Sequence, residues 1–209
     1  MKPIEFFELA WERCDHISAI HAYIANNVSG AVEPDELLRA EWVARLSALD
    51  LYVHELVSQR MLEAFLGQRR PATAFLRFRI SNETLVRIHS ASTITDKAAA
   101  FDLDIRTQLA RETFQSPEKI AEAIRLCSDI ELWNEIAIQL GATQSTKNSQ
   151  AKALKKSLSL LVERRNKIAH EADLQPSLPR NPWPIAQNDL HEVSTLVEQI
   201  VRTIDPLIP

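Results

Sequence analysis

Apolar residues recur along this chain at steps of three and four, which is the repeat of one helical face. This repeat and the helix-end signals predict helices over 4–27, 34–66, 81–88, 96–114, 129–140, 149–172 and 188–204, with a further one beginning at Ser116-Pro117. Five or six of them are substantial. The segment 75–80 alternates apolar and polar residues as a strand does, but it has no obvious partner strand and is predicted as loop. The pattern therefore favours an all-α bundle.

The second of these helices shows the clearest buried side. Its apolar positions are Leu38, Trp42, Leu46, Leu49, Val53, Leu56 and Val57. The 209-residue chain holds only Gly30, Gly67 and Gly141 as glycines, which are too few for a sheet-rich fold. Each follows a predicted helix and is expected to end it. We predict one domain over 1–209, in which the helix within 1–30 is a candidate accessory element.

Cysteine usage, metal-ligand spacing and hydropathy exclude several classes of protein. Cys14 and Cys127 lack CxxC spacing and are expected to be buried free thiols in a reducing compartment. The histidines form no HxxxH or HExxH motif, so neither a metal site nor a cofactor is predicted. No apolar stretch approaches the ~20 residues of a membrane span, and no signal peptide is evident. We expect a cytoplasmic protein.

Charge is distributed unevenly along the chain. The formal net charge of −4 argues against a general nucleic-acid coat. Positive residues nevertheless gather late in the chain, opposed only by Glu163, at Lys147, Lys152, Lys155, Lys156, Arg164, Arg165 and Lys167. This cluster has two interpretations: a local basic groove for nucleic acid, or a solvated helix face.

Arg165 interrupts the apolar side of the helix predicted over 149–172. It occupies a position of the stripe where leucine is expected, between Leu161 and Ile168. Burying an unpaired guanidinium is costly, so Arg165 either pairs with a carboxylate or lines a cleft that needs a cation. Asn166 and His170 are four residues apart and share one helical side. Arg165 and His170 lie about 140° apart around an ideal helix, so the long arginine side chain or a symmetric partner would have to bring them together.

These three residue types suffice for metal-free cleavage of RNA. Histidine exchanges a proton near neutral pH, and arginine binds phosphate while staying charged. An amide can orient a phosphate oxygen or the imidazole. The substrate supplies its own 2′-hydroxyl as nucleophile, so no serine or cysteine is needed. The spacing alone is equally consistent with a helix C-terminus that favours positive charge.

The run Glu163-Arg164-Arg165-Asn166-Lys167-Ile168-Ala169-His170-Glu171-Ala172-Asp173 resembles the signature of the HEPN superfamily. That signature is an arginine, four to six residues and a histidine, often with a polar residue directly after the arginine. The segments 49–55 and 130–133, together with Leu140-Gly141, resemble the RiboL-PSP branch. The resemblance covers roughly residues 35 to 205.

The resemblance implies a helical bundle of the HEPN type with additional helices, a homodimer and a composite cleft made from both signature motifs. It implies a metal-independent endoribonuclease that leaves a cyclic phosphate. In this chain Arg165 would stabilise the phosphate, His170 would act as acid or base, and Asn166 would orient either. Arg164 and Lys167 are the expected substrate-binding residues.

The same resemblance suggests a role in toxin–antitoxin, antiphage or stress-response systems, with RNA as substrate and an antitoxin of the nucleotidyltransferase type as partner. The alternative is a catalytically inactive HEPN-like module that dimerises or binds RNA or protein.

Two other features of the sequence have open interpretations. Asp50 and His54 are i,i+4 neighbours that either line the same cleft or form an ordinary helix-surface pair. Trp183 stands between Pro182 and Pro184 and is either a packing anchor or a platform on which a base stacks.

Overall fold

The computed structural model describes residues 1–28 and 33–209. In these ranges its helices are α1 (Pro3–Asn27), α2 (Asp35–Phe65), α3 (Asn82–Ser90), α4 (Ile94–Leu109), α5 (Pro117–Arg125), α6 (Leu132–Gln139), α7 (Lys147–Glu171) and α8 (Gln187–Leu207). One 3-10 turn, Phe75–Arg77, lies in the segment predicted as loop. The all-α prediction is confirmed. Ser29 and Gly30, expected in the turn after the first helix, lie outside the described residues.

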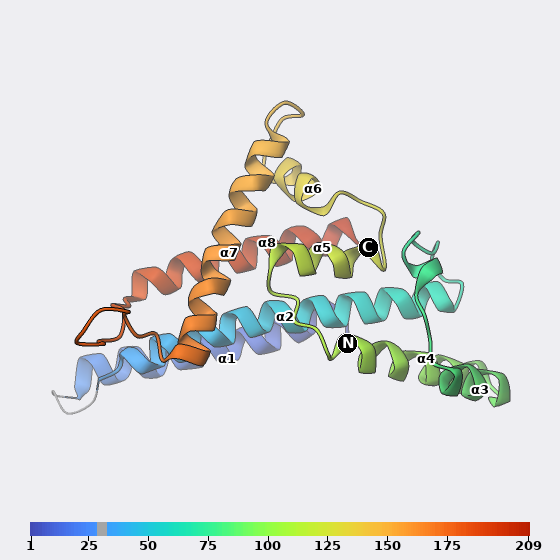
Figure 1. Cartoon of the computed structure of the whole chain (residues 1–209), viewed down its shortest axis with the longest axis horizontal. Helices are drawn as coiled ribbons and strands as arrows, with labels where there is room; N and C mark the ends of the chain where they lie inside the picture. Colours follow the sequence, from blue (N-terminus) through green and yellow to red (C-terminus); the bar gives the residue numbers. More distant parts are fainter. Residues whose placement is uncertain (29–32) are drawn as a thin grey trace.

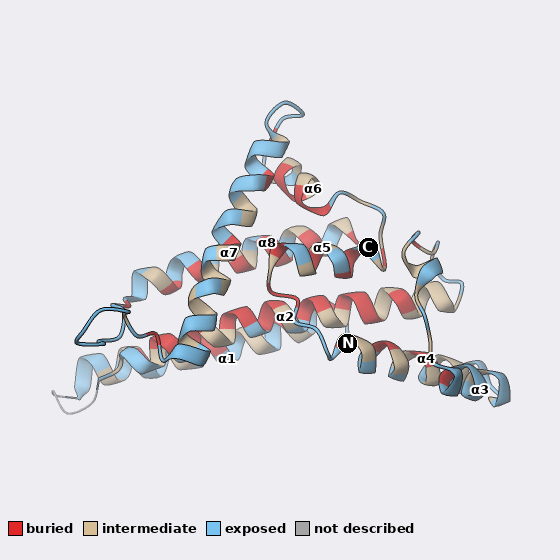
Figure 2. Ribbon diagram, in the orientation of Figure 1, coloured by how far each residue is buried: buried red, intermediate tan, exposed pale blue. Residues whose placement is uncertain are grey.

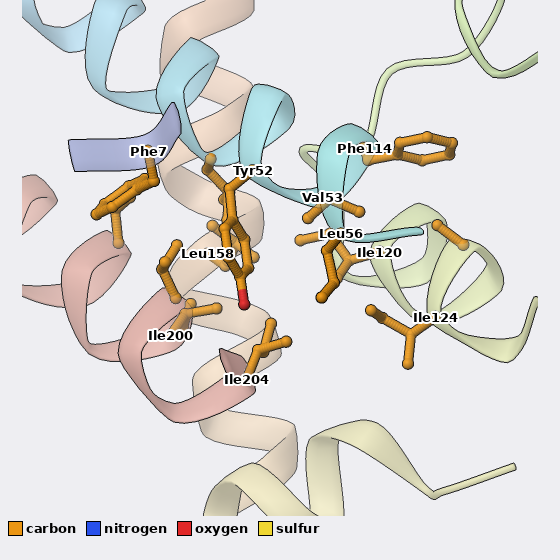
Figure 3. Packing of buried hydrophobic residues seen from close by; sticks show 14 of the residues in the cluster. Phe7, Tyr52, Val53, Leu56, Phe114, Ile120, Ile124, Leu158, Ile200 and Ile204 are labelled. Carbon is orange, nitrogen blue, oxygen red and sulfur yellow. The ribbon is translucent and has the colours of Figure 1, made fainter. Parts of the chain in front are cut away.

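Helix α2 is the centre of the bundle. Helices α1 and α8 pack along it, and α7 crosses α2 and α8 at a steep angle (Figure 1). All seven apolar positions that the sequence assigns to the buried side of α2 are buried. Figure 3 shows this core, where Tyr52 of α2 lies beside Phe7 of α1 and Ile200 of α8. Burial of these side chains is the main stabilising contribution to the bundle.

Most helix ends follow the local signals of the sequence. Ser116 caps α5, because its Oγ accepts a hydrogen bond from the Lys119 amide at 3.4 Å. Gly67 and Gly141 follow α2 and α6 with φ of +72° and +94°, a left-handed conformation that glycine adopts without steric cost.

Helix α4 ends at Leu109, five residues before the predicted end at 114. Phe114 lies beyond the helix and is buried in the core. Its backbone amide donates to Asp50 Oδ1 at 2.6 Å. Asp50 also lies 3.5 Å from His54 Nε2, and the His54 ring packs on Phe114. The Asp50–His54 pair therefore holds the connection between α4 and α5.

Two kinds of feature are absent from residues 1–28 and 33–209. None of the helices there has both the length and the hydropathy needed to cross a membrane. No group of three or more His, Cys, Asp or Glu side chains in the same ranges could hold a metal ion.

Both cysteines are free and buried, as the sequence predicts. Burial raises the pKa of the Cys14 thiol to about 11 and that of the Cys127 thiol to about 12. Since only the thiolate is a good nucleophile, we expect neither to react with iodoacetamide at pH 8 in the native protein, whereas both react in denaturant. Mass spectrometry of the alkylated protein measures this. Rapid native labelling of either residue would contradict the buried positions.

Candidate functional site

Helix α7 carries the predicted site and lies largely on the surface. Of its 25 residues, only Ala151 and Leu158 are buried within the part of the chain that the structure describes. Leu154, Leu161 and Ile168 of the predicted stripe are partly buried and pack against the core. Figure 2 shows the contrast with α2, which is buried along most of its length. Most polar side chains of α7 are therefore accessible to a ligand or a partner chain.

Arg165 has no carboxylate partner among the described residues. Its Nη1 donates to the Asn166 Oδ1 at 3.0 Å, and its Nε is buried without a hydrogen-bond partner. The first of the two alternatives for Arg165, pairing with a carboxylate, is thereby excluded within these residues. The Arg165–Asn166 contact leaves the guanidinium charge uncompensated at a half-buried position.

His170 lies in the last turn of α7 and is exposed. The helix is continuous from Arg165 to His170, so their Cα–Cβ bonds diverge by about 140°. No hydrogen bond links the two side chains among the interactions of the described residues. Asn166 contacts Arg165 and shares the helical side of His170. One chain therefore connects Arg165 with Asn166 but does not bring Arg165 to His170.

The end of α7 is fixed by a buried carboxylate that the sequence analysis did not single out. Ala172 and Asp173 have φ of 53° and 54°, which turns the chain sharply away from the helix. The Asp173 side chain is fully buried, and its Oδ2 accepts from Arg39 Nε at 3.2 Å and from Arg164 Nη2 at 3.3 Å. Arg39 lies in the first turns of α2. We call Asp173, Arg39 and Arg164 together the Asp173 clamp.

The Asp173 clamp also holds the proline-rich segment 174–186. Arg39 Nη2 donates to the Trp183 carbonyl, and Arg164 Nη2 donates to the Pro184 carbonyl, both at 2.7 Å. The Trp183 amide donates to the Asp173 carbonyl at 2.8 Å. These bonds satisfy backbone groups in a segment that forms neither helix nor strand. The segment is therefore attached both to α2 and to the helix that carries Arg165 and His170.

Arg164 was expected to bind substrate, but its guanidinium already contacts other groups of the protein. Besides Asp173 and the Pro184 carbonyl, it lies 5.0 Å from the centre of the Trp42 ring, a cation–π contact. A phosphate bound to Arg164 would compete with these contacts. Lys167 is exposed and has no carboxylate partner within the described ranges.

Sequence reasoning missed Arg39 and Asp173 for different reasons. Arg39 follows Leu38 on an otherwise apolar helix side, an anomaly of the kind that drew attention to Arg165. Asp173 is the last residue of the signature run, and no role was predicted for it. Their pairing joins positions 134 residues apart, which no local pattern shows.

Six of the seven Lys and Arg side chains of α7 lack a carboxylate partner among the described residues; Arg164 is the paired one. In contrast, Arg106 of α4 and Arg45 of α2 each contact two carboxylates. The local excess of positive charge predicted for 147–170 is therefore present on the surface of α7. Such an excess attracts polyanions.

The helical bundle and the surface helix with Arg165, Asn166 and His170 define a domain of the HEPN type. A sequence model of the family described as RiboL-PSP-HEPN matches residues 11–208. The chain therefore belongs to the RiboL-PSP-HEPN family. No curated protein and no solved structure matches it. Membership supports a role in RNA cleavage or RNA binding.

Proposed function

We propose that this protein is a metal-independent endoribonuclease. The observation that carries the proposal is the Arg165 guanidinium, which has no carboxylate partner in the described structure and lies against Asn166, five residues before an exposed histidine. A half-buried cation without a counter-charge is unfavourable for folding alone. A phosphate group would supply the missing negative charge.

In the proposed reaction, the ribose 2′-oxygen attacks the adjacent phosphorus. A new P–O2′ bond forms, the P–O5′ bond breaks, and the products are a 2′,3′-cyclic phosphate and a free 5′-hydroxyl. The proton of the 2′-hydroxyl is removed by a base, and an acid protonates the departing 5′-oxygen. His170 performs one of these proton transfers. Arg165 stabilises the negative charge that grows on the phosphoryl oxygens, and Asn166 orients the phosphate or the imidazole.

Two copies of the chain would form the complete site. Arg165 and His170 point away from each other on one helix, and α7 has few buried residues. A homodimer with the two α7 helices facing each other would place Arg165 of one protomer near His170 of the other. Lys167 and the other lysines of α7, which have no carboxylate partner among residues 1–28 and 33–209, would bind the RNA backbone. Arg164 would add its charge to the same helix end while holding Asp173.

For the biological role we propose a toxin or an antiphage or stress-response effector, silenced by a partner of the nucleotidyltransferase type. This part rests only on the resemblance of the run 163–173 to the HEPN signature.

The second candidate is an inactive module that dimerises or binds RNA or protein. The separation of Arg165 from His170 in one chain and the net charge of −4 favour it.

The test is cleavage of a labelled single-stranded RNA by the purified protein in excess EDTA. We expect cleavage products that end in a cyclic phosphate, and none with His170→Ala. His89→Ala is the matched control, because His89 is also exposed near the end of a helix but lies on α3 at the opposite end of the molecule (Figure 1). Binding of RNA without cleavage would favour the inactive module. Cleavage that survives His170→Ala would overturn the proposed site.

A further inference from the structure

A hollow lies at the C-terminal end of α7, where the helix meets the proline-rich segment. Lys167 and Glu171 line it from the helix, and Pro176, Arg180 and Trp183 line it from the segment. Lys167 precedes His170 by three residues, so the two are neighbours on the helix surface. The hollow therefore adjoins the proposed catalytic histidine.

Trp183 differs from the buried tryptophans of the core. Trp42 and Trp133 donate their indole N–H groups to the carbonyls of Leu161 and Pro117. Trp183 is 42% exposed, and its indole N–H has no hydrogen-bond partner among the described residues. Its large flat face and its N–H are therefore both available to a ligand.

The Trp183 backbone is nevertheless held firmly. Its N–H donates to the Asp173 carbonyl, and its C=O accepts from Arg39, so the Asp173 clamp fixes the residue from both sides. An isolated antiparallel β-bridge also pairs Leu174 with Pro182, the residue just before Trp183. The exposed ring is thus presented from an ordered backbone, which lowers the entropic cost of binding a flat ligand.

The charges around the hollow are mostly positive. Lys167 and Arg180 have no carboxylate partner within residues 1–28 and 33–209, and Glu171 is the one acidic residue that lines it. An aromatic ring flanked by free cations suits a nucleotide, since the ring stacks on the base while the cations bind phosphate.

We infer that this hollow is a nucleobase subsite of the proposed ribonuclease. The indole of Trp183 stacks on the base of a nucleotide next to the scissile phosphate, and Lys167 and Arg180 bind the phosphates that flank it. This inference rests on the proposed function for its choice of ligand, but binding can be measured without cleavage.

The experiment uses a fluorescently labelled single-stranded RNA with 2′-O-methyl riboses, which cannot be cut because the nucleophile is blocked. Anisotropy titration should show about 10-fold weaker binding for Trp183→Ala, the order expected for loss of one stacked base. Trp183→Phe keeps a ring and should stay within about 3-fold of the wild type. Arg180→Ala should also weaken binding. Arg111→Ala should not; Arg111 is an exposed arginine after α4 with no carboxylate partner among the described residues.

Stacking also has a spectroscopic signature. An unlabelled form of the same RNA should quench the tryptophan fluorescence of the wild type but quench that of Trp183→Phe much less. Thermal melts of each variant separate binding effects from unfolding. Equal affinity of wild type, Trp183→Ala and Arg180→Ala would overturn the subsite even if the protein cuts RNA. Conversely, binding that depends on Trp183, with no cleavage by the wild type, would overturn the proposed nuclease activity and leave the subsite supported.

Discussion

A mixture of Arg165→Ala and His170→Ala proteins is expected to recover ribonuclease activity that neither variant has alone. Each single variant should lose about 100-fold or more, because one removes the charge on the phosphoryl oxygens and the other removes a proton transfer. After subunit exchange, about half of the dimers hold one copy of each variant. If Arg165 and His170 act across the dimer, each mixed dimer has one intact site, so the mixture should reach about a quarter of the wild-type rate.

The recovery distinguishes a shared site from a site within one chain. The rate of RNA cleavage in EDTA is measured after co-refolding the two variants, with each variant co-refolded alone as control. If both residues act from the same chain, every site in a mixed dimer lacks one of them, and the mixture stays inactive. Inactivity in a sample shown by native mass spectrometry to contain mixed dimers would rule out the composite arrangement.

Asp173→Ala is expected to lower the free energy of unfolding by about 3 kcal/mol. The substitution leaves the guanidinium groups of Arg39 and Arg164 without their shared carboxylate. Breaking a buried pair in this way costs about 3–5 kcal/mol. The lower end applies here, because Arg39 keeps a salt bridge to Glu36 and the Arg164 side chain is 25% exposed.

Urea denaturation followed by circular dichroism measures this loss. Asp173→Asn keeps the shape and tolerates the left-handed backbone, so it should cost less than alanine and isolate the contribution of the charge. Glu171→Ala, an exposed carboxylate two residues earlier, is the matched control and should change stability by no more than about 0.5 kcal/mol. An unchanged unfolding midpoint for Asp173→Ala would show that the clamp does not stabilise the fold.

The sequence predicted well those elements whose burial is periodic. The stripe from Leu38 to Val57 is a helical repeat, and tertiary packing buries all of it. The helix predicted to reach Phe114 ends earlier at Leu109, because burial of Phe114 and its bond to Asp50 compete with helical propensity. Such competition depends on partners 64 residues away, which local patterns do not contain.

The candidate site was predictable in part. Arg165 stood out because a cation replaced an apolar residue, and the structure leaves it without a carboxylate partner in the described ranges. The assigned roles of Arg165, Asn166 and His170 stay predictions. The Asp173 clamp could not be predicted, because Arg39 and Asp173 look like ordinary charged residues until the fold brings α2 and the end of α7 together.

The position of Asp173, three residues after His170, has a practical consequence for genetics. A random-mutation screen that scores lost activity would return Arg39 and Asp173 alongside Arg165 and His170, and the four would look alike. Growing the same variants at a lower temperature would separate the two pairs. Variants of Arg39 and Asp173 should regain function because the folded state is populated again, whereas variants of Arg165 and His170 should not.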